Sequence, residues 1–99
     1  MEIEFRAGYY EWQVVVDGKV FYAFDDLSDD LGNVHNRSEL ESTVSDLVDD
    51  MFFAVQESLD FPESWANEYD AGVFASLKNS RPILEQAMVE RLAREYAIE

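Results

Sequence analysis

Hydrophobic and polar residues alternate along the first 25 positions, a pattern typical of β-strands that bury one face. The alternating apolar positions are Ile3 and Phe5, then Trp12, Val14 and Val16, then Val20, Tyr22 and Phe24. Asp17-Gly18 separates the last two runs, and this dipeptide favours a type I′ hairpin turn because both central residues need positive φ. We therefore predict about three antiparallel strands within residues 2–25, with Gly8 at a further turn or bulge.

After residue 38 the apolar spacing changes to three and four, which is the period of an amphipathic α-helix. Ser38 and Glu41 have the spacing of a capping box, in which each side chain accepts a hydrogen bond from the backbone N–H of the other residue. A long helix over about 39–59 is therefore predicted. Its apolar stripe comprises Leu40, Val44, Leu47, Val48, Met51, Phe52, Val55 and Leu59.

Further helical signals follow residue 59. Asp60 resembles an N-cap placed before Pro62 and Glu63, which are both favourable in a first helical turn. Apolar residues then recur at steps of four, but Gly72 leaves residues 71–77 open as either helix or strand. Pro82 opens a last helix. The apolar positions of these two segments are Trp65, Tyr69, Val73 and Leu77, then Leu84, Met88, Leu92 and Tyr96.

These elements predict one α+β domain over residues 1–99: an antiparallel β-meander of about three strands, followed by two or three α-helices packed on one face. A chain of 99 residues is too short for two independent cores, and 47% hydrophobic residues are enough for one. There is no cysteine, no signal-peptide pattern and no apolar run near the ~18 residues of a membrane span. We therefore expect a soluble cytoplasmic protein.

The net charge of −15 is concentrated in the middle of the chain. Residues 25–70 hold fourteen carboxylates and one cation, Arg37, a net charge of −13, whereas residues 71–99 hold four of each sign. Such a polyanion repels nucleic acid and anionic lipid, so neither is expected as a direct ligand. The charge points to a basic partner.

Acidic residues line the polar side of the 39–59 helix and the segment before it. Asp46, Asp49, Asp50 and Glu57 lie opposite the apolar stripe, at a spacing that can imitate a row of phosphates. Phe53 falls among them, either as an interface anchor or as a side chain that another element covers. The acidic face itself is either a binding surface or a solubilising one. A second acidic cluster precedes the helix and comprises Asp25, Asp26, Asp29 and Asp30.

Catalytic and metal-binding patterns are weak in this sequence. His35, the single histidine, lies in the polar stretch GNVHNR, which is typical of a surface loop. An EF-hand alignment on Gly32 places Leu27 and Ser38 at ligand positions that need carboxylates. No P-loop, Gly-x-Ser-x-Gly or Gly-x-Gly-x-x-Gly pattern is present. We expect no enzymatic activity, no cofactor and no metal site.

In size, acidity, lack of cysteine and mixed α+β content, the whole chain resembles the small acidic inhibitors of phages and mobile elements. These include anti-CRISPR proteins and other DNA mimics. That resemblance implies a protein that occupies the basic nucleic-acid channel of a CRISPR effector, nuclease or restriction enzyme. It is a likeness of class and not of any sequence motif.

A local stretch, LDFPESWANEYDA over residues 59–71, resembles the loop-to-helix segment of barstar, the ribonuclease inhibitor. The resemblance implies that Asp70 matches an acid that contacts the ribonuclease. The second acid of that family's helix falls at Phe74, which cannot play the role.

We therefore expect an acidic, non-enzymatic inhibitor of a nucleic-acid-binding protein. The alternatives are an immunity or antitoxin protein against a basic nuclease, and a regulatory interaction module. The chain is expected to be a monomer, or a homodimer through exposed aromatics such as Tyr9, Tyr10 and Trp12. The candidate partner-binding residues are Asp25, Asp26, Asp29, Asp30, Asp46, Asp49, Asp50, Phe53, Glu57 and Asp70.

Overall fold

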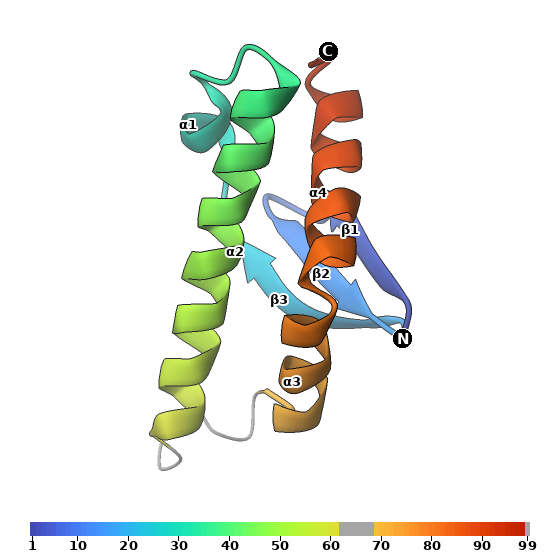
Figure 1. The fold of residues 1–99 in the computed structure, drawn as a ribbon, viewed down its shortest axis with the longest axis vertical. Helices are drawn as coiled ribbons and strands as arrows, with labels where there is room; N and C mark the ends of the chain where they lie inside the picture. Colours follow the sequence, from blue (N-terminus) through green and yellow to red (C-terminus); the bar gives the residue numbers. More distant parts are fainter. Residues whose placement is uncertain (62–68, 99) are drawn as a thin grey trace.

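The computed structural model describes residues 1–61 and 69–98 (Figure 1). Within these ranges, a three-stranded sheet precedes the helices, which confirms the predicted α+β class. The elements are β1 (Ile3–Ala7), β2 (Trp12–Val16), β3 (Lys19–Phe24), α1 (Ser28–Leu31), α2 (Arg37–Asp60), α3 (Ala71–Asn79) and α4 (Arg81–Glu95).

The sheet is an antiparallel meander in the order β1-β2-β3, as predicted. Asp17 has φ 50° and Gly18 has φ 83°, which are the values that a type I′ turn requires. The Asp17 side chain also accepts a hydrogen bond from the backbone N–H of Glu2 at 2.7 Å. This turn therefore anchors the beginning of β1 as well as joining β2 to β3.

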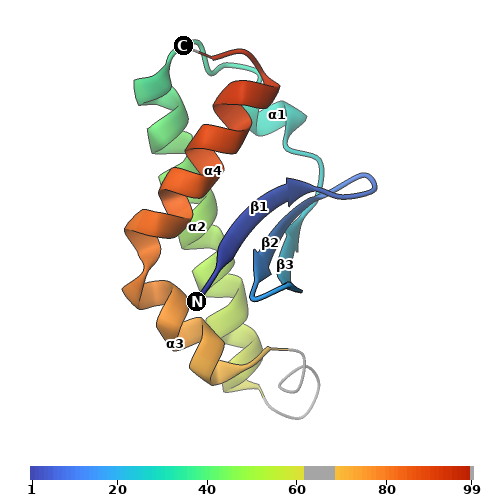
Figure 2. The ribbon, with the colours of Figure 1, turned by 90° about the vertical axis from the view of Figure 1, so that its right-hand side faces the viewer.

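The helices α2, α3 and α4 lie on one side of the sheet (Figures 1 and 2). The long helix α2 runs antiparallel to α4, with α4 over the β1 side and α2 towards the β3 side (Figure 1). The apolar faces of the sheet and the helices form one core. Its fully buried side chains on the two long helices are Leu40, Val44, Val48, Met51, Val55, Leu84, Met88 and Leu92.

The helix α2 follows the predicted apolar register, but its N-terminal cap differs from the prediction. Asn36, and not Ser38, is the N-cap, and its side chain accepts a hydrogen bond from the Glu39 backbone N–H at 2.9 Å. The Glu39 carboxylate in turn accepts from the His35 backbone N–H at 3.2 Å. Asn36-x-x-Glu39 satisfies the same capping pattern as Ser38-x-x-Glu41, so the sequence contained two candidate starts.

The boundary after α2 is a second correction. Asp60 is the last residue of α2 and does not cap a new helix. The predicted Pro62, Glu63 and Trp65 positions lie outside the described residues. Residues 71–77 are helical and belong to α3, which begins after Asp70.

The helix α4 has the predicted proline in its first turn and the predicted buried stripe, with one exception. Tyr96 caps the helix and is 40% exposed, because the helix ends at Glu95. Val89 and Ala93 add to the buried side instead.

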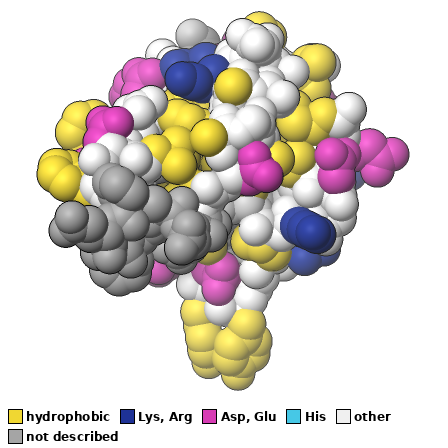
Figure 3. Space-filling model, turned by 90° about the horizontal axis from the view of Figure 1, so that it is seen from below, with side chains coloured by type: hydrophobic (Ala, Val, Ile, Leu, Met, Phe, Trp, Pro, Cys, Tyr) yellow, Lys and Arg dark blue, Asp and Glu magenta, His cyan; other side chains and the backbone are white. Residues whose placement is uncertain are grey.

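The β1–β2 turn projects from the body of the molecule, away from the helices (Figure 2). Tyr9 and Tyr10 lie in this turn and are exposed, as predicted. In the space-filling view from below, a group of hydrophobic side chains projects from the surface (Figure 3). Trp12 does not belong to this exposed group, because it is buried and stacks on Phe5 at 5.2 Å between ring centroids.

Among the described residues, no helix is long and apolar enough to cross a membrane.

Candidate partner-binding surface

The outward face of α2 carries three carboxylates and one phenylalanine. At about 100° per residue, positions 46, 50, 53 and 57 fall within a narrow sector of the helix. Asp46, Asp50, Phe53 and Glu57 are all exposed, as predicted. Phe53 is 71% exposed, so neither the sheet nor a described helix covers it. We call these four residues the α2 outer row.

Asp49 is exposed on the polar side of α2, as predicted, but it differs from the outer row because it has an ion-pair partner. Its Oδ1 lies 2.7 Å from Nη1 of Arg81 on α4. The same guanidinium donates to the backbone oxygen of Ser45 at 3.1 Å and contacts Glu85 at 3.4 Å. The hydrogen bond to Asp49 raises the pKa of Arg81. Asp49 therefore joins α2 to α4 and shares the positive charge of Arg81 with Glu85.

Apart from Asp49, the described carboxylates of residues 25–70 form no ion pair within the described ranges. All seven Lys and Arg residues lie in those ranges. The ion pairs found there involve four carboxylates, Asp49, Glu85, Glu90 and Glu95. Arg37, the single cation of the acidic segment, pairs with Glu90 of α4 at 2.6 Å. The described part of the acidic segment therefore keeps its excess charge.

The cluster before α2 surrounds the short helix α1. Asp25, Asp26, Asp29 and Asp30 are all exposed. Asp26 accepts hydrogen bonds from the Ser28 hydroxyl at 2.6 Å and from its backbone N–H at 2.9 Å, and these bonds lower the pKa of Asp26. Asp26 thus stabilises the start of α1, whereas Asp29 and Asp30 occupy its first turn.

Tyr22 on β3 is affected by one carboxylate from each acidic group. Burial raises the pKa of its hydroxyl, and the charges of Asp25, before α1, and Asp50, on α2, raise it further.

The Asp70 carboxylate has a structural role at the start of α3. It accepts hydrogen bonds from the backbone N–H groups of Gly72 at 2.8 Å and Val73 at 3.1 Å. It is the N-cap of α3, a structural role that the sequence reading had assigned to Asp60. Phe74, the other position of the barstar-like alignment, is buried in the core.

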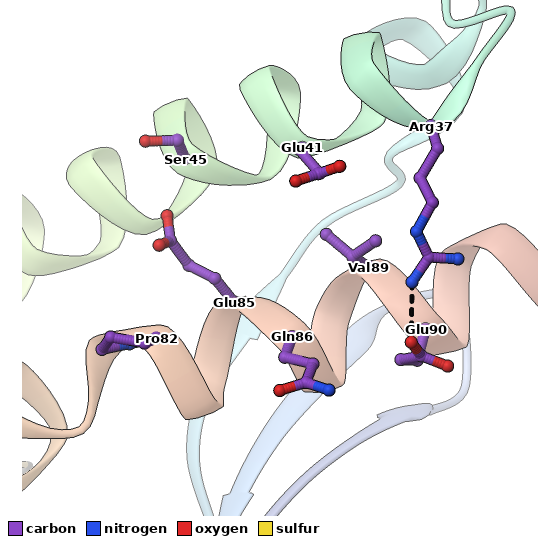
Figure 4. A pocket seen from close by; sticks show the side chains of 8 residues that line it. All are labelled: Arg37, Glu41, Ser45, Pro82, Glu85, Gln86, Val89 and Glu90. Carbon is purple, nitrogen blue, oxygen red and sulfur yellow. Dashed lines mark hydrogen bonds and ion pairs between the residues drawn. The ribbon is translucent and has the colours of Figure 1, made fainter.

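A groove of about 540 Å³ separates the N-terminal halves of α2 and α4 (Figure 4). Glu41 and Ser45 line it from α2, and Glu85 and Val89 line it from α4 (Figure 4). The Arg37–Glu90 ion pair spans one end. Two of the carboxylates in the lining already have partners, since Glu85 contacts Arg81 and Glu90 pairs with Arg37.

Features of a catalytic or metal centre are sparse among the described residues. His35 is exposed, and only its backbone N–H has a hydrogen bond, to Glu39. No group of three or more potential metal ligands is found in the described ranges.

The sequence alone did not identify Arg81 and Arg37 as partners of carboxylates at this surface. Each pairs with a residue distant in the sequence, Asp49 and Glu90 respectively, so periodicity carried no signal for either pair. The chain matches no protein-family model, and no curated protein or solved structure is significantly similar to it.

Proposed function

We propose that this protein is a non-enzymatic inhibitor that docks its acidic surface into the basic nucleic-acid-binding groove of another protein. The surface comprises the α2 outer row and the cluster around α1. The partner is a CRISPR effector, a nuclease or a restriction enzyme in the cytoplasm, where the inhibitor acts as a mimic of nucleic acid.

The observation that carries this proposal is the exposed Phe53 within a row of uncompensated carboxylates. Asp46, Asp50 and Glu57 have no ion-pair partner in the described ranges, although Arg81 of α4 pairs with Asp49. An exposed aromatic side chain ringed by polar groups is typical of an interface anchor. Side chains that only keep a protein dissolved have no need of such an aromatic.

The row also has a suitable length and rigidity. Eleven residues separate positions 46 and 57, so the carboxylates extend over about 16 Å of helix axis at 1.5 Å per residue. A partner that binds nucleic acid already has Lys and Arg side chains arranged for phosphates. A helix presents charges to them without the cost of ordering a flexible chain, and long-range attraction speeds the encounter.

The immunity-protein alternative relied on Asp70 and a barstar-like segment. Asp70 caps α3, and the position that should carry the second acid of that segment is Phe74, which is buried in the core. We therefore favour the extended acidic surface over a compact patch around Asp70.

The test is a comparison of two triple variants that change the net charge equally. The first is Asp46→Asn, Asp50→Asn, Glu57→Gln on the α2 outer row. The second is Glu2→Gln, Glu4→Gln, Glu95→Gln on exposed positions elsewhere. Each is assayed for inhibition of a panel of purified enzymes: a CRISPR effector complex, a restriction enzyme and a ribonuclease.

For the enzyme that the wild type inhibits, the first variant should lose affinity by about tenfold or more, and the second should stay within about threefold. Nucleic acid should compete with the wild type for that enzyme. Equal losses in both variants, or inhibition that persists at saturating nucleic acid, would contradict the proposal.

A further inference from the structure

The β1–β2 turn carries a pair of exposed tyrosines. Tyr9 is 83% exposed and Tyr10 is 84% exposed, and their ring centroids lie 4.4 Å apart at an interplanar angle of 62°. The turn extends beyond the rest of the sheet (Figure 2). Two packed aromatic rings at such a tip contribute nothing to the core.

The turn is closed by a backbone hydrogen bond and has one strained residue. The Gly8 backbone N–H donates to the Glu11 backbone oxygen at 2.7 Å. Tyr10 has φ 65°, which costs about 1 kcal/mol or more for a residue with a bulky side chain. Glycine or asparagine would suit that backbone better, so the tyrosine ring is there for another reason.

A pocket of about 310 Å³ lies beside this turn. Two carboxylates line it from separate segments, Glu11 in the turn and Asp26 after β3, together with Tyr10 and Trp12. Both hydrogen bonds from Ser28 go to Oδ1 of Asp26, which leaves Oδ2 available. Glu11 has a single long contact, at 3.4 Å from Gln13. Trp12 is buried, with Phe5 stacked on its ring and the Arg91 guanidinium 5.6 Å from the ring centroid, so Tyr10 provides the exposed ring. The pocket therefore combines one exposed aromatic ring with two carboxylates that retain accepting capacity.

We propose that this turn pocket binds an arginine side chain of a basic protein partner. A guanidinium is flat, stacks on aromatic rings and donates paired hydrogen bonds to carboxylates. A lysine ammonium is strongly hydrated and cannot make the paired bonds. A second copy of this chain is a poor occupant, because two chains of charge −15 repel each other.

The inference rests on the proposed function only in taking the partner to be a basic protein. The turn pocket and the α2 outer row belong to different elements, and Asp26 of the α1 cluster borders the pocket. The pocket thus adds an aromatic, arginine-selective contact at one edge of the acidic surface. That contact gives specificity, which a row of carboxylates alone supplies poorly.

The experiment is an NMR titration of the full chain with the peptide acetyl-Gly-Arg-Gly-amide, beside the same peptide carrying lysine. The arginine peptide should produce saturable shifts at the backbone amides of Gly8 and Glu11 and at the Trp12 indole. The affinity for the lysine peptide should be lower by about fivefold or by a larger factor. Equal affinity for the two peptides, or shifts spread evenly over the acidic segments, would overturn the inference.

Three variants complete the test. Tyr10→Asn keeps a side chain that tolerates positive φ, and Glu11→Gln keeps the shape of the turn; each should weaken the arginine peptide by about tenfold. Glu2→Gln, at an exposed position next to the opposite end of β1, makes the same charge change as Glu11→Gln and should leave that affinity unchanged. An equal loss in Glu2→Gln would reduce the site to general charge attraction and refute it. Because the probe is a peptide, this result is independent of whether the α2 outer row inhibits any enzyme.

Discussion

The helices α2 and α4 pack against each other with similar apolar faces, but their outward faces differ. On α4, Arg91 pairs with Glu95 at 3.7 Å, and Glu90 pairs at 2.6 Å with Arg37 of α2 across one end of the groove between the helices. On α2, the carboxylates of the outer row have no cation beside them in the described ranges. The fold needs only the inner faces of both helices. The charge on the outer face of α2 is therefore free to serve a purpose other than folding.

The largest change in stability is expected on the buried apolar faces, which the two helices have in common. Leu84→Ala on α4 removes a fully buried side chain, which should lower the free energy of unfolding by about 2–5 kcal/mol. The neighbouring Ile83 is 62% exposed, so Ile83→Ala should change that free energy by about 0.5 kcal/mol or less. Urea denaturation of the two variants measures the difference. Similar losses would mean that α4 does not present the described face to α2.

The next effect concerns the link between the helices. Arg81→Met removes the bonds to Asp49 and Ser45 while keeping an apolar stem, and should lower the unfolding free energy by about 1–2 kcal/mol. Arg91→Met removes only the longer pair with Glu95 and a stacking contact with Trp12. We expect a loss of about 0.5 kcal/mol for this control. Equal losses would show that Arg81 does not bridge α2 and α4.

Smaller changes in stability, of opposite sign, are expected when exposed carboxylates of α2 and of α4 are neutralised. Asp46→Asn with Asp50→Asn removes a like-charged pair one helical turn apart, and should raise the unfolding free energy by a few tenths of a kcal/mol. Glu90→Gln breaks the pair with Arg37 and should lower it by about 0.2–1 kcal/mol. Added salt should shrink both differences, since it screens exposed charges. A loss of stability in the Asp46–Asp50 variant would indicate that these carboxylates are paired.

The smallest effect is expected at high pH. Because the pKa of Tyr22 is raised above its ordinary value of 10.0, the folded state holds this proton more tightly than the unfolded state. Its contribution to stability is complete below the unfolded pKa and is lost as the pH rises through the folded pKa. Tyr22→Phe should therefore flatten the fall in stability above about pH 10. NMR titration of Tyr22 adds a direct check: Asp50→Asn should lower its pKa and Asp46→Asn should leave it unchanged.

Local patterns predicted most of the fold. The period of two located the strands, Asp17-Gly18 located the hairpin, and the apolar stripe set the register of α2. Element boundaries were less secure where two residues offered the same chemistry. Asn36 and Ser38 both precede a glutamate by three, and Asp60 and Asp70 are both good caps. Packing, and not local pattern, chose between them.

The candidate surface was predicted only in part for a related reason. Helical spacing placed Asp46, Asp50, Phe53 and Glu57 on the outside, because that spacing depends on α2 alone. The ion pair between Asp49 and Arg81 depends on how α4 aligns with α2, and the periodicity of neither helix encodes that alignment. Contacts between residues distant in the sequence could therefore not be predicted from local patterns.

The packing of α4 against β1 has a consequence for the growing chain. Since α4 covers the first strand, the core cannot close until residues 81–95 have left the ribosome. Before then, the apolar faces of the sheet and α2 are exposed together, which is the condition under which nascent chains associate. The polyanionic segment over residues 25–70 is synthesised earlier than α4, so its mutual repulsion already keeps neighbouring nascent chains apart during that interval.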